Sequence, residues 1–315
     1  MKRITSVYDE SPRYGYFKAH LVPSIRLTAI RCSVSIFNNF FLRQFIEAFF
    51  LPGRIPTHRV DHPLDKKIPF VPSWVTVYLD FVSFWLRVLA FLFNRYGRKA
   101  HAEVRDFIET LRKLYLFAAV TYRQNLSTTN RPFYIARPRF LMIHLLDPHL
   151  YCVPSLHVMV VVRTYTKFRA ILQSLGEAEY FKAQLEEMKQ GALAITQAIL
   201  FIKQHSVNCI PAALYAMTCF DRVLFPPEEA EAFIALLFCE APPPPADAND
   251  SMPYRKMRPW AVPKTRLSPE DIAEIKAHIV SLYRRFITEG ETARKWEEPL
   301  LRFMRQMPEK GTENN

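Results

Sequence analysis

Six apolar stretches, separated by basic or proline-containing connections, constrain the fold of this 315-residue chain more than any other feature. The strongest of them, 70–93, is long enough to cross a bilayer, because a transmembrane helix needs about 20 mainly apolar residues. Half of all residues are apolar and 14% are aromatic. The chain is therefore predicted to be all-α, a polytopic membrane helix bundle of about six transmembrane helices. The six stretches are 29–51, 70–93, 107–122, 140–165, 191–201 and 209–225.

Basic residues are unevenly distributed among the connections. The segment before the first stretch and the connection 94–105 are both basic, so the positive-inside rule places them in the cytoplasm. The loops 151–157 and 203–208 then come together at the opposite, extracytoplasmic face. Both chain termini are expected to be cytoplasmic.

A run of prolines at 242–245 divides the chain. Residues 1–241 are predicted to form the membrane-embedded domain, and 242–315 a linker followed by a cytosolic tail of amphipathic helices. Ser268 and Pro269 begin a helix in this tail, as an N-cap and a residue suited to the first helical position. One apolar face of that helix contains Ile272, Ile275, Ile279, Leu282 and Phe286.

The formal net charge of +12 suits an anionic lipid surface and, taken alone, nucleic acid equally well. No zinc-finger spacing, aromatic RNA-binding signature or long basic block accompanies this charge, so no nucleic-acid partner is expected. The five cysteines are scattered and lie mostly in apolar runs, which is typical of small buried side chains and not of a metal site or a disulfide framework. No cofactor and no metal are predicted.

Asp80 and Arg87 are charged residues inside the strongest apolar stretch. They are seven residues apart and hence lie near one face of a helix. Charges at bilayer depth are costly and normally face a protein interior or each other. A packing role and a functional role are both open for this pair.

The segment 151–157, Tyr-Cys-Val-Pro-Ser-Leu-His, precedes an apolar run and concentrates three chemical capacities. Pro154 suits the first turn of a helix, where its missing N–H costs nothing. Ser155 offers a hydroxyl beside helix N–H groups that lack partners and can bind an anion. His157 titrates near neutral pH and can give a proton to a leaving group.

Two other segments complete a pattern. Residues 202–208, Ile-Lys-Gln-His-Ser-Val-Asn, place His205 at the end of an apolar run. Upstream, Arg131-Pro132 supplies a guanidinium that can hold phosphate oxygens in a bidentate fork. The order Arg-Pro, Pro-Ser-Leu-His, Lys-Gln-His resembles that of the type 2 phosphatidic acid phosphatase superfamily. The similarity covers about residues 65–220 and is closest to the inositol phosphorylceramide synthases and related lipid phosphotransferases.

The resemblance implies an integral membrane enzyme that acts on a phosphorylated lipid through a phosphohistidine intermediate. In that mechanism His205 attacks phosphorus and His157 protonates the departing alkoxide. Water as acceptor gives a phosphatase, whereas a lipid or sugar hydroxyl gives a head-group phosphotransferase, and the sequence leaves both open. The phosphate-binding residues that it implies are Arg131, Ser155, Lys203 and Arg123.

Three positions depart from the family pattern. Asn208 stands where the family has an aspartate that orients and charges the nucleophilic histidine, and it is expected as the third catalytic residue. An amide can still hydrogen-bond the ring, but it cannot stabilise an imidazolium. Gln124 replaces the lysine that opens the first motif, with Arg123 beside it, and Ile199 replaces an arginine of the phosphatases. Either Lys203 and Arg123 compensate for these changes, or the site is impaired.

Two alternatives therefore stay open. One is a catalytically degenerate membrane protein of the same fold that binds lipid or a partner. The other is a soluble basic helical protein in which both histidines are incidental. A shared site predicts that the imidazoles of His157 and His205 lie within about 10 Å, which one phosphate and its hydrogen bonds can bridge, with Arg131 beside them. His144 and His149 are expected to be structural or surface residues.

Overall fold

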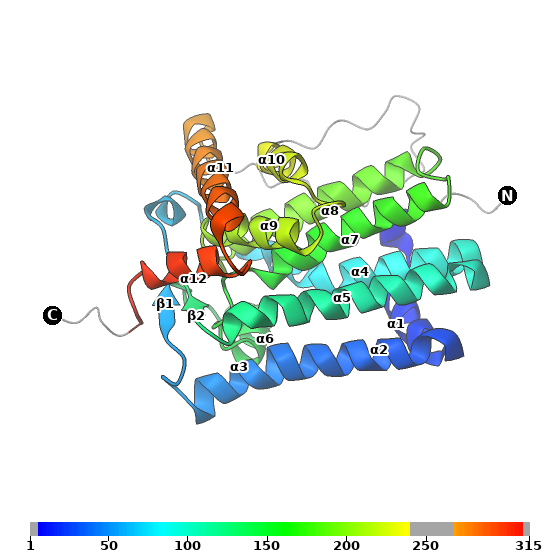
Figure 1. The fold of residues 1–315 in the computed structure, drawn as a ribbon, viewed down its shortest axis with the longest axis horizontal. Helices are drawn as coiled ribbons and strands as arrows, with labels where there is room; N and C mark the ends of the chain where they lie inside the picture. The colour runs from blue at the N-terminus through cyan, green and yellow to red at the C-terminus, as the bar shows by residue number, and fades with distance from the viewer. Residues whose placement is uncertain (1–5, 240–266, 311–315) are drawn as a thin grey trace.

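Helices dominate the computed structural model, which describes residues 6–239 and 267–310 (Figure 1). Four long helices lie along the long axis of the molecule, and α9 packs against α7 at their left-hand end in Figure 1. The all-α class is thereby confirmed. These helices are α4 (Val75–Tyr96), α5 (His101–Tyr122), α7 (Leu156–Ser174), α8 (Lys182–Phe201) and α9 (Cys209–Phe220).

The central helix α4 is buried over most of its circumference. Its residues from Val88 to Phe93 are all buried, and a helix that is apolar all round belongs in a core. Asp80 and Arg87 form a bidentate pair on this helix, with N–O distances of 2.7 and 2.8 Å, so the two charges face each other. Gly97 ends α4 with φ 56°, in the left-handed region that glycine adopts without strain.

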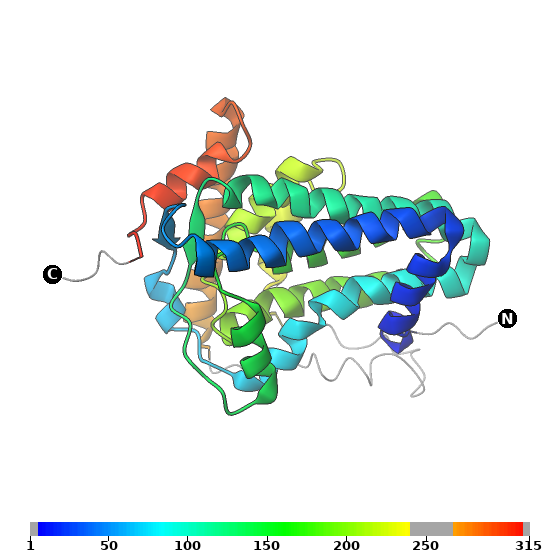
Figure 2. The same ribbon diagram turned by 90° about the horizontal axis from the view of Figure 1, so that it is seen from below.

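An outer layer covers α4 and α5. The short helix α1 (Pro12–Leu21) crosses α4 at Gly15, where an added Cβ would lie 2.2 Å from the carbonyl oxygen of Leu86. Helix α2 (Pro23–Ile36) packs along α5, as Figure 2 shows, and continues through the π-helical turns Phe37–Leu42 and Ile46–Phe50, with α3 (Arg43–Phe45) between them. Exposed large apolar side chains gather on this layer: Phe17, Leu21, Leu27, Ile30, Val34, Phe37, Phe41, Leu42, Phe49 and Phe50.

The described residues contain one helical stretch that is long and apolar enough to cross a membrane, Pro72–Tyr122, and Gly97 divides it into α4 and α5. Helix α9 is apolar but has only 12 residues. Helix α8 begins at Lys182, so the helix that contains the fifth apolar stretch extends into the charged segment before it. The structure supports a mostly helical protein, and six membrane spans remain a proposal.

A small sheet, not expected from the sequence, joins distant segments at the left-hand end in Figure 1. Strand β1 (Thr57–Arg59) pairs in parallel with β2 (Leu126–Thr128), and His58 lies opposite Ser127. Single bridges add Tyr151 beside Ser127 and Glu309 beside His58. Because these contacts link the loops after α3, α5 and α12, they bring the end of the chain to the same place as the segment 151–157.

The C-terminal helices belong to the same hydrophobic core as the bundle. Helix α11 (Pro269–Thr292) begins at Ser268, whose Oγ accepts from the Asp271 N–H, as predicted. Ile275, Ile279, Leu282 and Phe286 are buried on its face toward α9, and Tyr283 lies 2.9 Å from Thr218 through their hydroxyls. The expected separate tail is therefore part of one packed unit, and the predicted linker at 242–245 lies outside the described residues. The remaining helices are α6 (Pro138–Leu146), α10 (Pro227–Leu236) and α12 (Glu298–Arg305).

Candidate functional site

His157 lies in the first turn of α7. The helix begins at Leu156 with Ser155 as the N-cap, so Pro154 precedes the helix and does not occupy its first turn as expected. The His157 ring lies with its centroid 4.4 Å from each of the rings of Tyr78 and Phe81 on α4. With 8% of the residue exposed, His157 is held in one orientation by two aromatic neighbours.

His205 lies on the loop between α8 and α9 and faces His157. The two imidazole centroids are 5.4 Å apart, within the distance that a shared phosphate requires. Ser155 joins the pair, because its Oγ lies 3.4 Å from His205 Nε2. The structure thus brings together the two histidines and the serine that the motif order selected.

Asp65, in a short 3-10 turn (Pro63–Lys66), supports the loop that carries His205. One carboxylate oxygen accepts from the Val207 N–H at 2.8 Å, and the other accepts from the His62 N–H at 2.8 Å. Burial raises the pKa of Asp65, and hydrogen bonds from Ser206 and these two N–H groups oppose that rise. Asp65 lies before all three motifs, and no pattern in the sequence distinguishes it from other aspartates.

Arg131 lies at the edge of the histidine pair. Its Nη1 donates to Gln204 Oε1 at 3.2 Å, next to His205 in the chain, and its Nη2 donates to the Asp147 carbonyl at 3.2 Å. The Asp147 carboxylate lies 3.8 Å from the same guanidinium. Arg131 is therefore beside the site, as expected, with part of its hydrogen-bonding capacity already engaged.

His149, expected to be a structural or surface residue, is buried beside the histidine pair. Its ring centroid lies 6.3 Å from that of His205, and its Nε2 lies 2.8 Å from Thr129 Oγ1. It is buried, and its backbone has φ 63°. Burial, followed by the charge of Arg131, lowers the pKa of His149 well below its usual value. The only signal in the sequence was its place two residues after Asp147, in the loop before the serine–histidine motif.

His205 is neutral in this setting. Burial lowers the pKa of His205 to about 3. A hydrogen bond with the Cys152 backbone opposes this shift, and the positive charge of Arg131 adds to it. A neutral imidazole keeps a nitrogen lone pair that can attack an electrophile. Its Nδ1 is buried and has no hydrogen-bond partner among the described residues. An unpaired buried nitrogen costs stability, so it is a candidate for direct use in chemistry.

Two expected phosphate ligands do not join the histidines. Lys203, with φ 55°, directs its ammonium to the carbonyl oxygens of Asp65 and Ile68, the second at 2.5 Å. Arg123 is exposed at the end of α5 and donates to Asn39 Oδ1 at 2.9 Å. Gln124 donates to Glu297 Oε1 at 3.3 Å. These side chains hold neighbouring segments together, so the compensation expected of Lys203 and Arg123 has no basis in their contacts.

Asn208 does not contact His205 through a hydrogen bond within the described residues, contrary to its expected orienting role. Its Nδ2 donates to the Val60 carbonyl at 3.1 Å, and its Oδ1 lies 2.8 Å from Nε2 of His278 on α11. The His278 ring stacks on His62 with centroids 3.9 Å apart. Both ends of the amide therefore tie the histidine loop to other elements.

The described residues hold no group of three or more histidine, cysteine, aspartate or glutamate side chains placed to bind a metal ion. No family model, curated protein or solved structure matches the chain. Function is therefore inferred from the chemistry of the site itself: a neutral buried histidine, a second histidine and a serine hydroxyl in contact range, and a guanidinium at the edge.

Proposed function

We propose that this protein is an integral membrane enzyme that transfers the phosphoryl group of a phosphorylated lipid, as a phosphatase or a head-group phosphotransferase. The observation that carries the proposal is the pairing of His157 and His205, 5.4 Å apart, with Ser155 touching His205. A phosphate between two imidazoles has a nucleophile on one side and a proton donor on the other, which is what phosphoryl transfer through histidine needs.

The proposed reaction has two displacements. The neutral His205 imidazole gives a nitrogen lone pair to phosphorus, and the P–O bond to the lipid breaks. The bound phosphate anion favours the protonated form of His157, which gives its proton to the departing alkoxide. Water or a second hydroxyl then attacks the phosphohistidine, and His157 takes its proton. The P–N bond breaks, which returns His205 to its starting form. Arg131 and the Ser155 hydroxyl stabilise the phosphate oxygens through both steps.

An apolar cavity of about 310 Å³ supports a lipid as the substrate. It lies between α1, α2, α4 and α5, and its walls include Phe40, Phe81, Trp85 and Tyr115. Phe81 also contacts the His157 ring, so the cavity adjoins the proposed reaction centre. A hydrocarbon chain would fill such a space, since apolar surface removed from water contributes about 25 cal/mol per Å².

Membrane insertion is part of the proposal. The exposed apolar side chains of the α1–α2 layer and the Pro72–Tyr122 stretch support it. Asn208 contacts His278 on α11, and the bridge from His58 to Glu309 holds residue 309 close to the site. We therefore propose that the site and residues 267–310 lie on the same side of the bilayer. An extracytoplasmic site and a cytoplasmic C-terminal region, both expected from the sequence, cannot both hold in this proposal. Retention of the protein in membranes after carbonate extraction is the expected result, and release into the soluble fraction would remove this part.

The decisive experiment is turnover of a short-chain phosphatidate by the purified protein, with and without an alcohol acceptor. Release of inorganic phosphate indicates a phosphatase, and a phosphorylated acceptor indicates a transferase. Trapping of acid-labile phosphate on His205 in a single turnover would support the intermediate. Absence of any product from every phosphorylated lipid tried would count against an enzyme.

A degenerate, lipid-binding relative is the second candidate, and one observation favours it. The amide of Asn208 is engaged by Val60 and His278, so no carboxylate or amide orients His205 Nδ1 in the described residues. Binding of phosphatidate without turnover, unchanged in a His205→Ala variant, would favour this candidate over the enzyme.

A further inference from the structure

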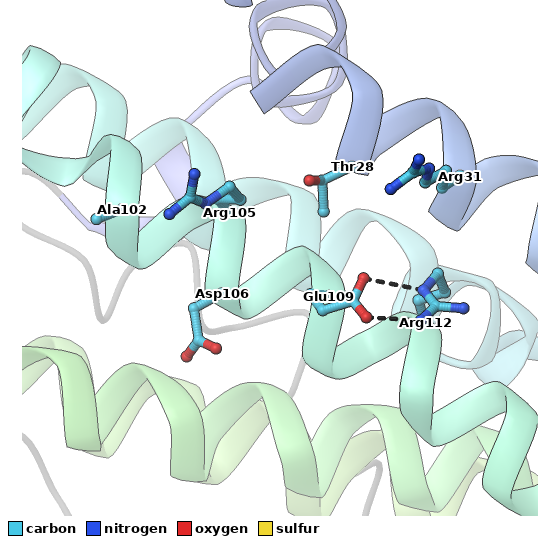
Figure 3. Close-up of a pocket in the computed structure, with 7 residues that line it drawn as sticks. All are labelled: Thr28, Arg31, Ala102, Arg105, Asp106, Glu109 and Arg112. Carbon is cyan, nitrogen blue, oxygen red and sulfur yellow. Dashed lines mark hydrogen bonds and ion pairs between the residues drawn. The ribbon is translucent and has the colours of Figure 1, made fainter. Parts of the chain in front are cut away.

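A charged groove lies far from the histidines, between α2 and α5 (Figure 3). It has a volume of about 540 Å³. Along α5, Arg105 precedes Tyr122 at the histidine end by 17 residues, which corresponds to about 25 Å at 1.5 Å per residue. The groove is therefore separate from the site described above. Its lining consists of Thr28 and Arg31 on α2, and Ala102, Arg105, Asp106, Glu109 and Arg112 on α5.

The two carboxylates of the groove already have cationic partners. Glu109 accepts from Arg112 through two hydrogen bonds of 2.6 and 2.9 Å, drawn as dashes in Figure 3. Asp106 forms an ion pair with Lys167 on α7. Each acid is thus neutralised by a base other than Arg31 and Arg105.

Arg31 and Arg105 keep the hydrogen-bonding capacity of their guanidinium groups, although Arg31 also interacts electrostatically with Glu109. Both residues are exposed, and neither has an ion pair or side-chain hydrogen bond in residues 6–239 and 267–310. They lie on either side of Thr28 in Figure 3, and the Thr28 hydroxyl can also donate. The groove therefore combines two free guanidinium forks with a hydroxyl on two helices fixed by their packing.

We propose that this groove binds a phosphate-bearing anion through Arg31, Arg105 and Thr28. Guanidinium groups bind phosphate oxygens in a bidentate fork, and a phosphate has enough oxygens to serve two forks and a hydroxyl at once. A carboxylate has two oxygens and would leave part of this donor set unused. The volume exceeds that of one phosphate, so the ligand carries a further group.

Two sources share this chemistry, a soluble phosphorylated metabolite and the headgroup of an anionic lipid. The groove opens near the start of α5, next to the basic turn 97–100, where a headgroup at a membrane surface would also be attracted. Binding tests with one probe of each kind separate the sources.

The soluble probe is glycerol 3-phosphate, titrated calorimetrically into the purified full-length chain in neutral detergent. The lipid probe is phosphatidate added to the same sample, with phosphatidylcholine for comparison, and bound lipid is counted by native mass spectrometry. We expect the double variant Arg31→Gln/Arg105→Gln to weaken binding of the effective probe by about tenfold or more, since two charge-assisted contacts are lost. Arg31→Lys/Arg105→Lys keeps the charge without the fork and should weaken it by about threefold.

The matched control is Arg222→Gln/Arg305→Gln, which removes the same charge from exposed positions after α9 and in α12, outside the groove. It should leave binding within about twofold, because distant surface charges are screened. All these variants are made in a His157→Ala/His205→Ala/Arg131→Gln background, which removes the histidine site and leaves the groove intact, so the binding that is counted does not come from that site. An equal loss in the control and groove variants, binding that survives in the groove variant, or no binding of either probe by the wild type would overturn the proposal.

Discussion

The two segments that carry the histidines are alike in sequence character and differ in how they are held. In the segment 151–157, Ser155 and His157 both face the shared site. In the segment 203–208, only His205 does so, while Lys203 and Asn208 turn to neighbouring elements. Two segments of similar composition thus differ: the first contributes two residues to the site, and the second contributes one.

The difference follows from what anchors each segment. The segment 151–157 is held from outside: Ser127 accepts from the Cys152 N–H at 3.3 Å and from the Val153 N–H at 2.8 Å, and Tyr122 donates to the Pro154 carbonyl. The side chains of Ser155 and His157 are therefore free for chemistry. The segment 203–208 is held from outside by Asp65 at the Val207 N–H, but it is also attached through its own Lys203 and Asn208 side chains, which therefore cannot also bind a ligand.

The largest expected effect comes from removing the histidines themselves. In the proposed reaction His205→Ala abolishes phosphoryl transfer, because it removes the nitrogen that attacks phosphorus. His157→Ala should lower turnover by about 10²–10⁴-fold, and least for substrates with good leaving groups, which depart without protonation. Phosphate release from phosphatidate and from an aryl phosphate measures both.

A control for this pair is His144→Ala, on α6 outside the site, where the imidazole accepts only a long hydrogen bond of 3.4 Å from the Tyr134 N–H. Its activity should stay close to that of the wild type. Equal losses in all three variants would indicate a general folding defect and not a shared site.

The second prediction concerns the anchor of the histidine loop. Asp65→Ala leaves the N–H groups of Val207 and His62 without their 2.8 Å acceptors. Because hydrogen bonds to a charged group contribute about 1.5–3 kcal/mol each, we expect a loss of about 3 kcal/mol in the free energy of unfolding. Denaturant unfolding measures it, with the exposed residue Glu291 changed to Ala as the control. A loss below about 0.5 kcal/mol would show that Asp65 does not hold the loop.

The third prediction separates the two roles considered for Lys203. Lys203→Met removes the donor to the carbonyls of Asp65 and Ile68, and should lower stability by about 1–2 kcal/mol while KM changes by less than about twofold. Thermal unfolding and steady-state kinetics on the same sample provide both values. A KM raised about tenfold at unchanged stability would return Lys203 to the role of phosphate ligand.

Local sequence signals predicted what local interactions decide. The helix start at Ser268 and the position of Asp80 and Arg87 on one helix face depend on short-range pattern. The approach of His157 to His205, which are 48 residues apart, was predicted from the order of the motifs. The contacts of Asn208 could not be predicted, because its partner His278 lies 70 residues away on another helix. The pairing of β1 with β2 is likewise non-local, and strands of three residues carry too little pattern to be recognised.

The last prediction concerns the segment 203–208 and its link from Asn208 to His278 on α11. Burial, and then the proximity of His62, lower the pKa of His278 from 6.5 to about 4. Between about pH 4 and pH 6.5, His278 is protonated more often in the unfolded chain than in the folded protein. The contribution of His278 to the free energy of unfolding therefore falls as the pH is lowered from about 6.5 to about 4. Thermal unfolding of the wild type should therefore shift downward between pH 7 and pH 5. His205, whose pKa is also lowered, adds to the same shift.

Asn208→Asp tests the contribution of His278. Its carboxylate would face His278 Nε2 at the present 2.8 Å contact and favour the charged imidazolium, so the pKa of His278 should rise and the shift between pH 7 and pH 5 should become smaller. His278→Gln should reduce the shift as well, because it removes the titrating group. Turnover should not rise in Asn208→Asp, since the new charge is directed to α11 and to the Val60 carbonyl and not to His205. Increased turnover with an unchanged pH response would instead mean that residue 208 orients the nucleophile, and the two histidine segments would then contribute alike.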